Sequence, residues 1–442
     1  MIHFFKYTSL FFLLIFFNKI NAQKVLTLEA AINQALENNH DIRLKKIDAN
    51  IAKNNVNPAM VGKRPTVELN AAASIGWSDA AVETINLAPN AEGNTALDLN
   101  GFNQEFSIGP QVNFLLFDGK ASTYRLEQLK TVSDINNLSL RHAMEQTVLE
   151  VSNLYLAIAR QESQKTILKQ SIALTQDRLN RSVTDEKYGT ATSLQSLQIQ
   201  VDLKTDSINL RNLELHIDNT RRQLNFVLGL APDETFEVIQ KFTVQPLVSL
   251  AELEANLRQE NTLLEVQKKN ILAADFDQKM ANAAFLPTVS AFGGANFFFQ
   301  QDEANFLQQN RVFGPSIGLR MNYPIFDGGA RTVRASNAKL EIEKRKLDEH
   351  KLEDDLVTQL HIEYANYKNS KRDLAIEKSN LSTFEKNLEF LQDNFKNGLA
   401  NNTDVRAAQL NLNALKNKIT DYEFQLYLAE IKLNYLAGRL VK

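Results

Sequence analysis

The sequence predicts a mainly α protein with a smaller β part, in which long coiled-coil helices adjoin membrane strands. Three observations predict this fold: a pattern that occurs twice, two very long segments without glycine or proline, and extended segments whose apolar and polar residues alternate. Four strands per chain cannot close a barrel around an open lumen, so several copies must contribute. We therefore expect an oligomer whose strands together close a transmembrane β-barrel.

The first 22 residues, MIHFFKYTSLFFLLIFFNKINA, have the layout of a secretory signal peptide. Lys6 supplies the positive start, Leu10 to Phe17 form a short apolar core, and Ala22 is a small residue before the expected cleavage. The apolar run is too short for a spanning helix, which needs roughly 20 residues. We therefore expect an exported protein.

Composition excludes several classes of protein. Without the signal segment the chain has 47 basic against 52 acidic residues, a net charge of −5, which gives no reason to expect nucleic acid as a partner. The chain has no cysteine, and none of its six histidines form a pair at ligand spacing, so metal catalysis is not expected. No exported segment has 18 consecutive apolar residues, so a membrane part must be β-structure in a closed barrel.

A duplication organises the chain. The motif Phe117-Asp118-Gly119 recurs as Phe326-Asp327-Gly328, an offset of 209 residues, and the same offset relates Tyr155 to Tyr364, Gly189 to Gly398 and Asn225 to Asn434. Pro65-Thr66-Val67 recurs as Pro287-Thr288-Val289 at an offset of 222, and we expect the 13 extra residues in a loop within 78–103. The predicted parts are a signal peptide (1–22), a first repeat (23–228), a linker or strap (229–249), a second repeat (250–438) and a short tail (439–442).

Each repeat has the same predicted order of elements. A helix of about 35 residues, spanning 26–59 or 250–284, ends before Pro65 or Pro287, where an extended segment begins. Two strands of about 13 residues follow, because apolar and polar residues alternate with period two. The apolar positions are Val67, Leu69, Ala71, Ala73, Ile75 and Trp77, then Phe106, Ile108, Val112, Phe114 and Leu116, and in the second copy Ile317, Leu319, Met321, Tyr323 and Ile325. A soluble sandwich would show the same alternation, but only long helices flank these strands, so a lipid-facing wall fits better.

A very long helix then follows each Asp-Gly. The ranges Ala121–Lys187 and Ala330–Lys396 contain neither glycine nor proline over 67 residues, which corresponds to about 100 Å of helix. Each ends at a glycine turn, where Gly189 or Gly398 can take the left-handed conformation, and a second helix returns. Apolar residues recur every seven positions, which is typical of a left-handed coiled coil: Leu360, Tyr367, Leu374, Leu381, Leu388 and Phe395.

The chain resembles the TolC-like outer-membrane efflux protein family over nearly all of its exported part. The resemblance depends on the duplicated order of helix, PTV, strand pair, FDG, long helix, glycine turn and returning helix, with YPIFDGG the most specific part. It implies a homotrimer in the cell outer membrane, whose twelve strands form one barrel and whose helices form a tunnel across the periplasm. It also implies transport rather than enzymatic activity, and no cofactor.

The resemblance further implies partners and site residues. Cargo would come from an inner-membrane pump of the RND, ABC or MFS type, through a periplasmic adaptor, in efflux or type I secretion. The adaptor would contact the two turns, Tyr188-Gly189-Thr190 and Asn397-Gly398-Leu399. Thr403, Asp404 and Gln195 would line the periplasmic entrance, where three copies of Asp404 give a ring of carboxylates that attracts cations. Equally, Asp404 can simply cap the last helix.

Some positions depart from the family pattern. A second acidic position is Ala407, the first-repeat counterpart of Asp404 is Gln195, and a basic position near the turn is Ala400, so the contacts that close some relatives can differ here. The joints between barrel and tunnel would be Pro65, Phe117, Asp118, Gly119, Pro287, Phe326, Asp327 and Gly328. The alternative function is that of an exported coiled-coil rod or tether without channel activity; a passive porin is disfavoured, because porins have many strands per chain and no long helices. The cargo and the identity of the pump are not encoded in the sequence.

Overall fold

The structure is a computed structural model that describes residues 25–84, 95–189, 192–240, 242, 248–304 and 309–440, so the predicted signal peptide lies outside the described residues. The chain divides into two compact units, each built from both sequence repeats. The helical unit comprises the chain up to His40, Gln146–Val248 and Ile362–Asn434; the sheet unit comprises Asp41–Glu145, Ser249–His361 and Tyr435–Lys442.

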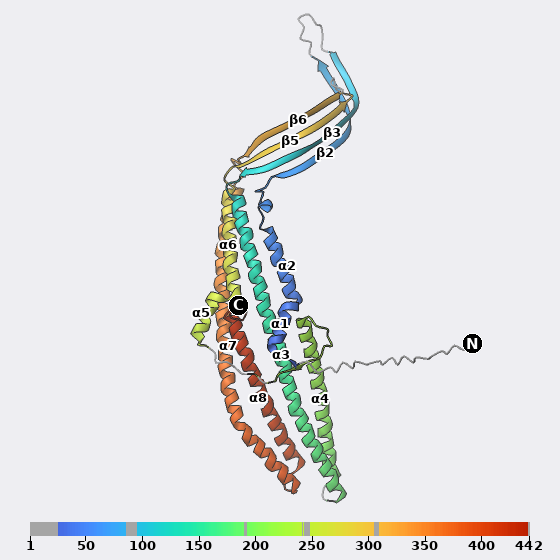
Figure 1. Cartoon of the computed structure of the whole chain (residues 1–442), viewed down its shortest axis with the longest axis vertical. Helices are drawn as coiled ribbons and strands as arrows, with labels where there is room; N and C mark the ends of the chain where they lie inside the picture. The colour runs from blue at the N-terminus through green and yellow to red at the C-terminus, as the bar shows by residue number, and fades with distance from the viewer. Residues whose placement is uncertain are drawn as a thin grey trace, which may run out of the picture. The chain divides into compact units, whose positions relative to one another are not determined.

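The sheet unit contains one four-stranded sheet in the order β2-β3-β5-β6, with every neighbouring pair antiparallel (Figure 1). The strands are β2 (Thr66–Thr84), β3 (Thr95–Phe117), β5 (Thr288–Asp302) and β6 (Gln309–Asn322). The central β3–β5 pair joins the two repeats, and its register shifts between Leu115 and Phe117. Such a bulge re-aims the side chains that follow it, and it places Phe117 opposite Val289.

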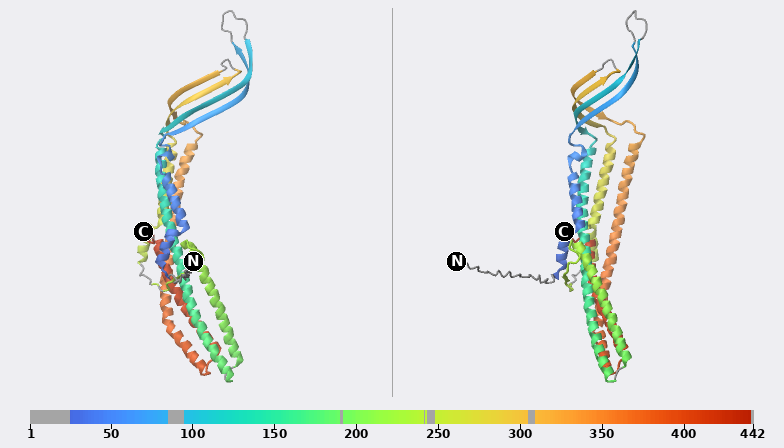
Figure 2. Two further views of the ribbon diagram at one scale, coloured as in Figure 1. Left: turned by 45° about the vertical axis from the view of Figure 1, so that its right-hand side comes forward. Right: turned by 90° about the vertical axis from the view of Figure 1, so that its right-hand side faces the viewer.

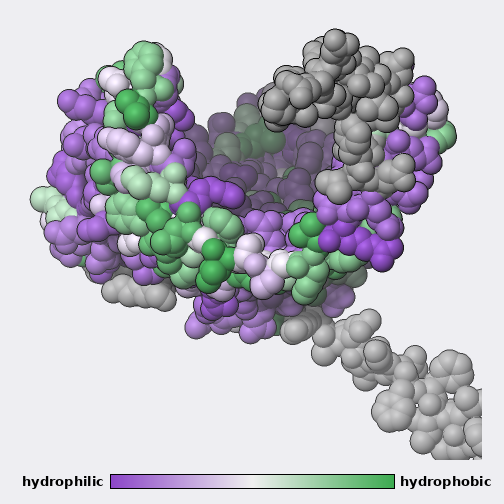
Figure 3. All heavy atoms as spheres, turned by 90° about the horizontal axis from the view of Figure 1, so that it is seen from above, coloured by the Kyte–Doolittle hydropathy of each residue, from purple (hydrophilic) through white to green (hydrophobic). Residues whose placement is uncertain are grey.

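One face of the sheet is apolar on all four strands. Residues directly opposite each other in antiparallel strands project from the same face, so the observed register groups the side chains. The apolar face contains Val67, Leu69, Ile75 and Trp77 of β2, Phe102, Phe106, Ile108 and Val112 of β3, Ala291, Phe297 and Phe299 of β5, and Phe313, Ile317, Leu319 and Met321 of β6. Figure 3, which looks onto the strand end, shows patches of apolar residues among polar ones on the visible surface. The predicted alternation is therefore present, and no other element among the described residues covers its apolar side.

The two hairpins differ in length. The first-repeat strands have 19 and 23 residues, and the second-repeat strands have 15 and 14. The expectation that the 13 extra residues form a loop within 78–103 was wrong in part, because residues up to Thr84 and from Thr95 continue the two strands in register, while 85–94 lies outside the described residues. Most of the inserted residues therefore lengthen the first hairpin, since each strand supplies the hydrogen-bonding partners of the other.

The prediction that Tyr323 and Ile325 belong to the last strand was also wrong. Strand β6 ends at Asn322, so Tyr323, Ile325 and Phe326 follow it outside the sheet. Pro324 explains the early end, because proline has no N–H group to donate to a neighbouring strand. Phe117, by contrast, is the last residue of β3, as predicted.

The long helices have the predicted bounds, whereas the predicted first helix of each repeat is broken. The long pair is α3 (Ala121–Lys187) and α7 (Ala330–Lys396), and the returning pair is α4 (Ser193–Leu228) and α8 (Asn402–Leu436). In place of single helices of about 35 residues, the chain forms α1 (Leu28–Asn38), α2 (His40–Asn55) and a 3-10 turn η1 (Pro58–Val61) in the first repeat, and α5 (Leu250–Glu260) and α6 (Thr262–Ala283) in the second.

An asparagine causes each break. Asn39 and Asn261 have extended backbone, with ψ of 132° and 121°, which ends one helix and starts the next. Each side-chain amide donates a hydrogen bond of 3.0 Å to a carbonyl at the end of the returning helix of its own repeat, Val227 for Asn39 and Leu436 for Asn261. The two asparagines are 222 residues apart, which is the offset between the two Pro-Thr-Val motifs. The duplication therefore includes this hydrogen bond.

The helical unit consists of two antiparallel helix pairs, α3 with α4 and α7 with α8, and a short two-stranded parallel sheet, β1 (Val25–Leu26) with β4 (Glu237–Val238), which we call the belt. Ion pairs link α3 to α4 and α7 to α8, and Figure 2 shows each pair side by side. The buried core contains Ala31, Ala35, Val151, Tyr155, Ile158, Ile217, Leu224 and Leu228. The Tyr155 hydroxyl donates to the Leu26 carbonyl at 2.7 Å and accepts from the Ile239 amide at 2.9 Å, so it fastens the belt to α3. Among the described residues, no helix has the length and hydropathy needed to cross a membrane.

Candidate functional site: the glycine-turn ends of the helix pairs

The two glycine turns expose apolar side chains. Gly189 and Gly398 have φ of 77° and 73°, the left-handed conformation expected from the sequence. After α7 the chain closes as a Schellman turn, in which the Leu399 amide donates to the Asn394 carbonyl at 2.8 Å. Tyr188 is 80% exposed and Leu399 is 78% exposed. Both turns therefore expose a large side chain to solvent; Thr190 lies outside the described residues.

Asp404 belongs to a capping box at the start of α8. Its amide donates to the Asn401 side-chain oxygen at 3.0 Å, and its carboxylate accepts from the Asn401 amide at 3.4 Å. This reciprocal pair satisfies two free donors of the helix end, so capping is one role of Asp404. The Asp404 and Thr403 side chains are nevertheless exposed, whereas Gln195 at the start of α4 is half-buried. A single chain thus leaves the Asp404 side chain at the surface.

A buried ion pair near these turns was missed from the sequence. Arg406 binds Asp206 through two nearly parallel hydrogen bonds, of 2.7 and 2.8 Å, and its Nε lies 3.7 Å from the nearer carboxylate oxygen of Asp202. Asp206 is only 3% exposed. Such a bidentate, desolvated pair fixes the start of α8 against α4. Its members are 200 residues apart, and no sequence pattern linked them.

A polar ladder continues from this pair between α3 and α8. The Gln409 amide donates to the Ser171 carbonyl at 2.8 Å and to the Ser171 hydroxyl at 2.6 Å, and the Asn413 amide also reaches that hydroxyl at 2.9 Å. Gln409 is 2% exposed. A buried polar contact that is satisfied on both sides specifies the alignment of two helices more sharply than apolar packing alone. The α8 helix is therefore registered against both helices of the first repeat.

The predicted joints between sheet and helix have the expected caps. The Asp118 carboxylate accepts from the Ser122 amide at 2.6 Å, and Asp327 accepts from the Arg331 amide at 3.0 Å. Gly119 and Gly328 have φ of 68° and 67°, and Pro65 and Pro287 immediately precede β2 and β5. The geometry accounts for the repeated Phe-Asp-Gly as a strand-to-helix bend.

The second joint carries an additional charge contact. Arg331 Nε lies 3.1 Å from the Asp327 carboxylate, and its guanidinium stacks on the Phe285 ring at 5.3 Å from the centroid. Desolvation acts to raise the pKa of Asp327, but the Arg331 charge and hydrogen bonds from the Arg331 and Gly329 amides outweigh it and lower that pKa. Ser122 is the first-repeat counterpart of Arg331, so the first joint has no such pair.

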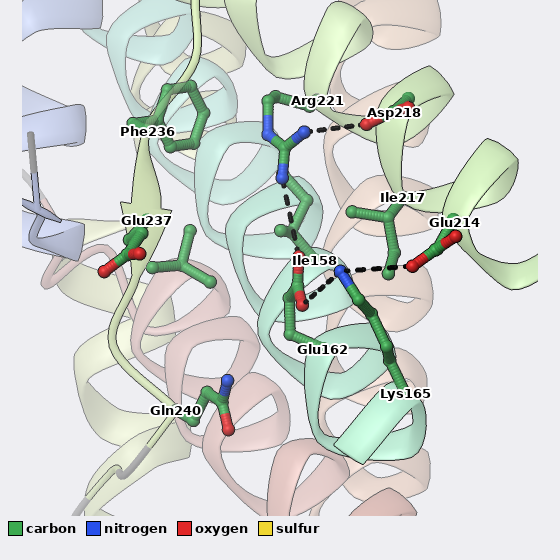
Figure 4. A pocket seen from close by; sticks show the side chains of 11 residues that line it. Ile158, Glu162, Lys165, Glu214, Ile217, Asp218, Arg221, Phe236, Glu237 and Gln240 are labelled. Carbon is green, nitrogen blue, oxygen red and sulfur yellow. Dashed lines mark hydrogen bonds and ion pairs between the residues drawn. The ribbon is translucent and has the colours of Figure 1, made fainter. Parts of the chain in front are cut away.

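A cavity of about 640 Å³ lies between α3, α4 and the belt strand β4 (Figure 4). Its charged groups bind one another: Arg221 lies 2.8 Å from Asp218 and 3.5 Å from Glu162, and Lys165 lies 3.4 Å from Glu162. Both cations of the wall are bound by its acids, so the network is best explained as a clasp between α3 and α4. We assign it no ligand.

Comparison with known proteins gives a family model and a set of similar folds. The model described as outer membrane efflux protein matches residues 31–230 and 253–439. The Campylobacter jejuni CmeC outer membrane channel is 13% identical, covering 94% of this chain and 86% of that chain with a TM-score of 0.76. The open state of the Neisseria gonorrhoeae MtrE outer membrane channel is 14% identical, with coverage of 94% and 89% and a TM-score of 0.69.

A third solved structure has a similar fold. The outer membrane protein VceC of Vibrio cholerae is 13% identical, with coverage of 93% and 96% and a TM-score of 0.73. Identities this low show a shared fold, and they confirm the predicted combination of helical tunnel and β part. No curated protein sequence matches the chain significantly.

Proposed function

Because the chain belongs to the outer membrane efflux protein family, we propose that three copies form one conduit that receives cargo from an inner-membrane pump through a periplasmic adaptor. The family resemblance predicted from the repeated motifs is confirmed, and so are the outer-membrane location and the role in efflux. The trimer, the partners, the entrance residues and the lack of catalytic activity belong to the proposal.

The observation that carries the proposal is the unfinished sheet. Strands β2 and β6 are its two edges, and among the described residues neither edge has a partner on its outer side. Its apolar face is also uncovered, with Ile317 91% exposed and Leu319 72% exposed. An open edge beside an apolar face is unfavourable in lipid, because unpaired backbone groups find no hydrogen bonds there. Pairing of β6 in one copy with β2 of the next removes the edges and turns the apolar face to lipid.

Exposed heptad stripes on the helical unit support the same assembly. On α4 the stripe consists of Leu194, Val201, Ile208 and Leu215, spaced by seven residues and each at least 57% exposed. On α7 it contains Ile362, Ile376 and Phe390, spaced by fourteen and each at least 51% exposed. Stripes of this period are contact seams of coiled helices. We infer that α4 of one copy packs on α7 of the next, a head-to-tail contact that closes into a ring.

The entrance follows from the same arrangement. Around a threefold axis the exposed Asp404 carboxylates, with Thr403 and Gln195 nearby, would form an acidic ring that favours cations. The exposed Tyr188 and Leu399 at the glycine turns support these turns as the contact for an adaptor, since large exposed apolar groups are typical of interaction sites. The pump would supply both cargo selection and energy.

The assembly is tested on the full chain extracted in detergent. Native mass spectrometry should give a trimer, and a cysteine pair placed on β6 and β2, Leu319→Cys with Leu69→Cys, should cross-link between copies under oxidation. Recovery of a monomer in the soluble periplasmic fraction would contradict the conduit and favour a rod or tether.

The entrance is tested by planar-bilayer conductance. Asp404→Asn removes the charge but keeps an oxygen that can accept the Asn401 amide, so the cap is retained. We expect the cation preference to fall while conductance persists. Asp233→Asn, an exposed acid in the segment after α4, is the matched control and should leave the selectivity unchanged; unaltered selectivity in Asp404→Asn would remove this residue from the entrance.

A further inference from the structure

A small cavity of about 170 Å³ lies in the helical unit, close in sequence to the glycine turns. Its walls come from α3, α7 and α8, and they include Arg178, Arg181 and Lys396. Asp177 is the single acidic residue of the lining, and Lys396 already binds Asp393 at 2.7 Å. The lining therefore has three cations and one acid, and Asp393 from outside the lining offsets Lys396.

Arg178 is the unusual member of this lining. It is only 6% exposed, and its buried Nε has no hydrogen-bond partner. Its closest side-chain contact is a marginal one of 3.5 Å from Nη2 to the Thr175 hydroxyl. Within the described part of the chain no carboxylate oxygen lies within the 4.0 Å of an ion pair with Arg178. A buried guanidinium with donors to spare is costly unless an anion completes its hydrogen bonds.

The nearby acids are already engaged. Asp206 forms both of its short contacts with Arg406, and Asp202 lies 3.7 Å from the same guanidinium. Desolvation is the largest influence on the Arg178 pKa and lowers it, and Arg406 acts in the same direction, against Asp202 and Asp206. Arg178 therefore has no carboxylate within ion-pair distance among the described residues, because both nearby acids contact Arg406.

We propose that this cavity receives the carboxylate of an aspartate or glutamate carried on a helix of a partner protein that docks beside the glycine turns. The inference rests on the proposed function, which places an adaptor at these turns, and it adds the chemistry of the contact. Arg178 and Arg181 would bind the carboxylate, with the buried Arg178 fork giving the directional hydrogen bonds.

The rim favours a helix over a free anion. Leu174 is 42% exposed at the edge of the cavity and Phe395 is half-buried, so these two residues form an apolar border, whereas Val405 is only 1% exposed and lies inside the cavity wall. A free phosphate would leave this border in water, whereas a helix covers it with apolar residues on either side of its acid. Complexes of helices in grooves use this combination of apolar anchors and one polar contact.

The test uses the full-length channel and the periplasmic adaptor encoded in the same genome. Arg178→Met keeps the apolar stem of the side chain but removes the guanidinium, and Arg211→Met, at an exposed arginine of α4, is the matched control. We expect the Arg178→Met channel to bind the adaptor at least tenfold more weakly and the control channel to bind it normally. One acid-to-amide change in the adaptor should cause the same loss, and the two changes together should cost no more than either alone.

Thermal unfolding separates docking from a structural role. If Arg178 only stabilised the Asp206–Arg406 pair, Arg178→Met would lower the unfolding midpoint. Removal of an unpaired buried charge should instead leave the midpoint unchanged or raise it. Undiminished adaptor binding, or losses that add, would overturn the proposal.

Small probes distinguish failure of the cavity from failure of the proposed function. If the unaltered channel does not bind the adaptor, the proposed function loses its partner and the docking inference falls with it. Glutarate and neutral glutaramide then test the cavity alone, where Arg178-dependent binding of glutarate would retain its carboxylate chemistry. Binding of inorganic phosphate that requires Arg178, with adaptor binding indifferent to Arg178, would make this a site for a free anion and overturn the proposed occupant.

Discussion

The returning helices α4 and α8 hold the same place in the two repeats but bury their apolar residues differently. Leu215 of α4 is 57% exposed, whereas its counterpart 209 residues later, Phe424, is 7% exposed. Leu197 of α4 is also 57% exposed, and its counterpart is Arg406, which forms the bidentate pair with Asp206. At these two positions the first repeat leaves an apolar side chain exposed, whereas the second repeat has a side chain that contacts its own chain.

This difference teaches how a duplicated chain can form a closed assembly. If α4 and α8 were equivalent, the chain would carry two similar free faces or none. Because α8 is held by buried apolar and polar contacts, the free seams are left on α4 and α7, one from each repeat. Two different free seams on one chain permit a head-to-tail ring.

The largest effect is expected from charging the free seam of α4. Ile208→Asp with Leu215→Asp places two carboxylates in the proposed contact with α7 of the next copy, where desolvation opposes them. We expect loss of the trimer in native mass spectrometry, while circular dichroism retains the helical signal. Asn209→Asp, on an exposed neighbouring position, is the control and should remain trimeric. A trimer that survives the double change would place the seam elsewhere.

The next largest effect concerns the buried pair that anchors α8. Asp206→Ala leaves Arg406 without its bidentate partner, and breaking a buried pair in this way costs about 3–5 kcal/mol. Urea unfolding should report the loss, and hydrogen exchange should rise in the first turns of α8. Replacing both residues, Asp206→Leu with Arg406→Met, should recover most of the stability, because no unpaired charge remains. A double variant as unstable as the single one would mean that packing volume, and not charge, sets the cost.

Local signals were sufficient to predict the longest elements. Glycine turns and the absence of helix breakers define the ends of α3 and α7, and period-two alternation defines the sheet faces. The same reasoning missed the breaks at Asn39 and Asn261, because asparagine is a weak helix breaker and its effect here comes from a carbonyl about 180 residues away. The early end of β6 followed from Pro324, whose missing donor outweighs the apolar pattern of Tyr323 and Ile325.

Less of the candidate site than of the fold could be predicted from the sequence. The turns and the Asp404 cap are local, so residue types and spacing indicate them. The Asp206–Arg406 pair and the Arg178 cavity depend on which helices meet, and that contact joins segments 200 or more residues apart. A buried charge on an amphipathic helix resembles an ordinary solvated charge until its neighbours are known.

A smaller effect should come from the third residue of each joint. Lys120 has φ of 73°, and its counterpart is Gly329, with φ of 86°. The left-handed conformation costs a non-glycine residue roughly 1–2 kcal/mol. Lys120→Gly should therefore raise the free energy of unfolding by about 1 kcal/mol, and Gly329→Lys should lower it by a similar amount. Scanning calorimetry of the two variants checks this, and a loss of stability in Lys120→Gly would show that the lysine makes a compensating contact.

The smallest effect should distinguish the joints by pH. The Asp327 pKa is lowered in the folded chain, through Arg331 and the amides of the bend, relative to an unfolded aspartate. The folded state then binds fewer protons than the unfolded state over this interval, so the contribution to stability is present above the unfolded pKa and is lost as pH falls through the folded pKa. Arg331→Met should flatten this acid-side dependence in unfolding measurements, and so should Asp327→Asn. Because Asp327 is near the surface, the difference should shrink at high salt. A dependence that persists unchanged in both variants would assign the acid sensitivity to other carboxylates and leave the two joints electrostatically alike.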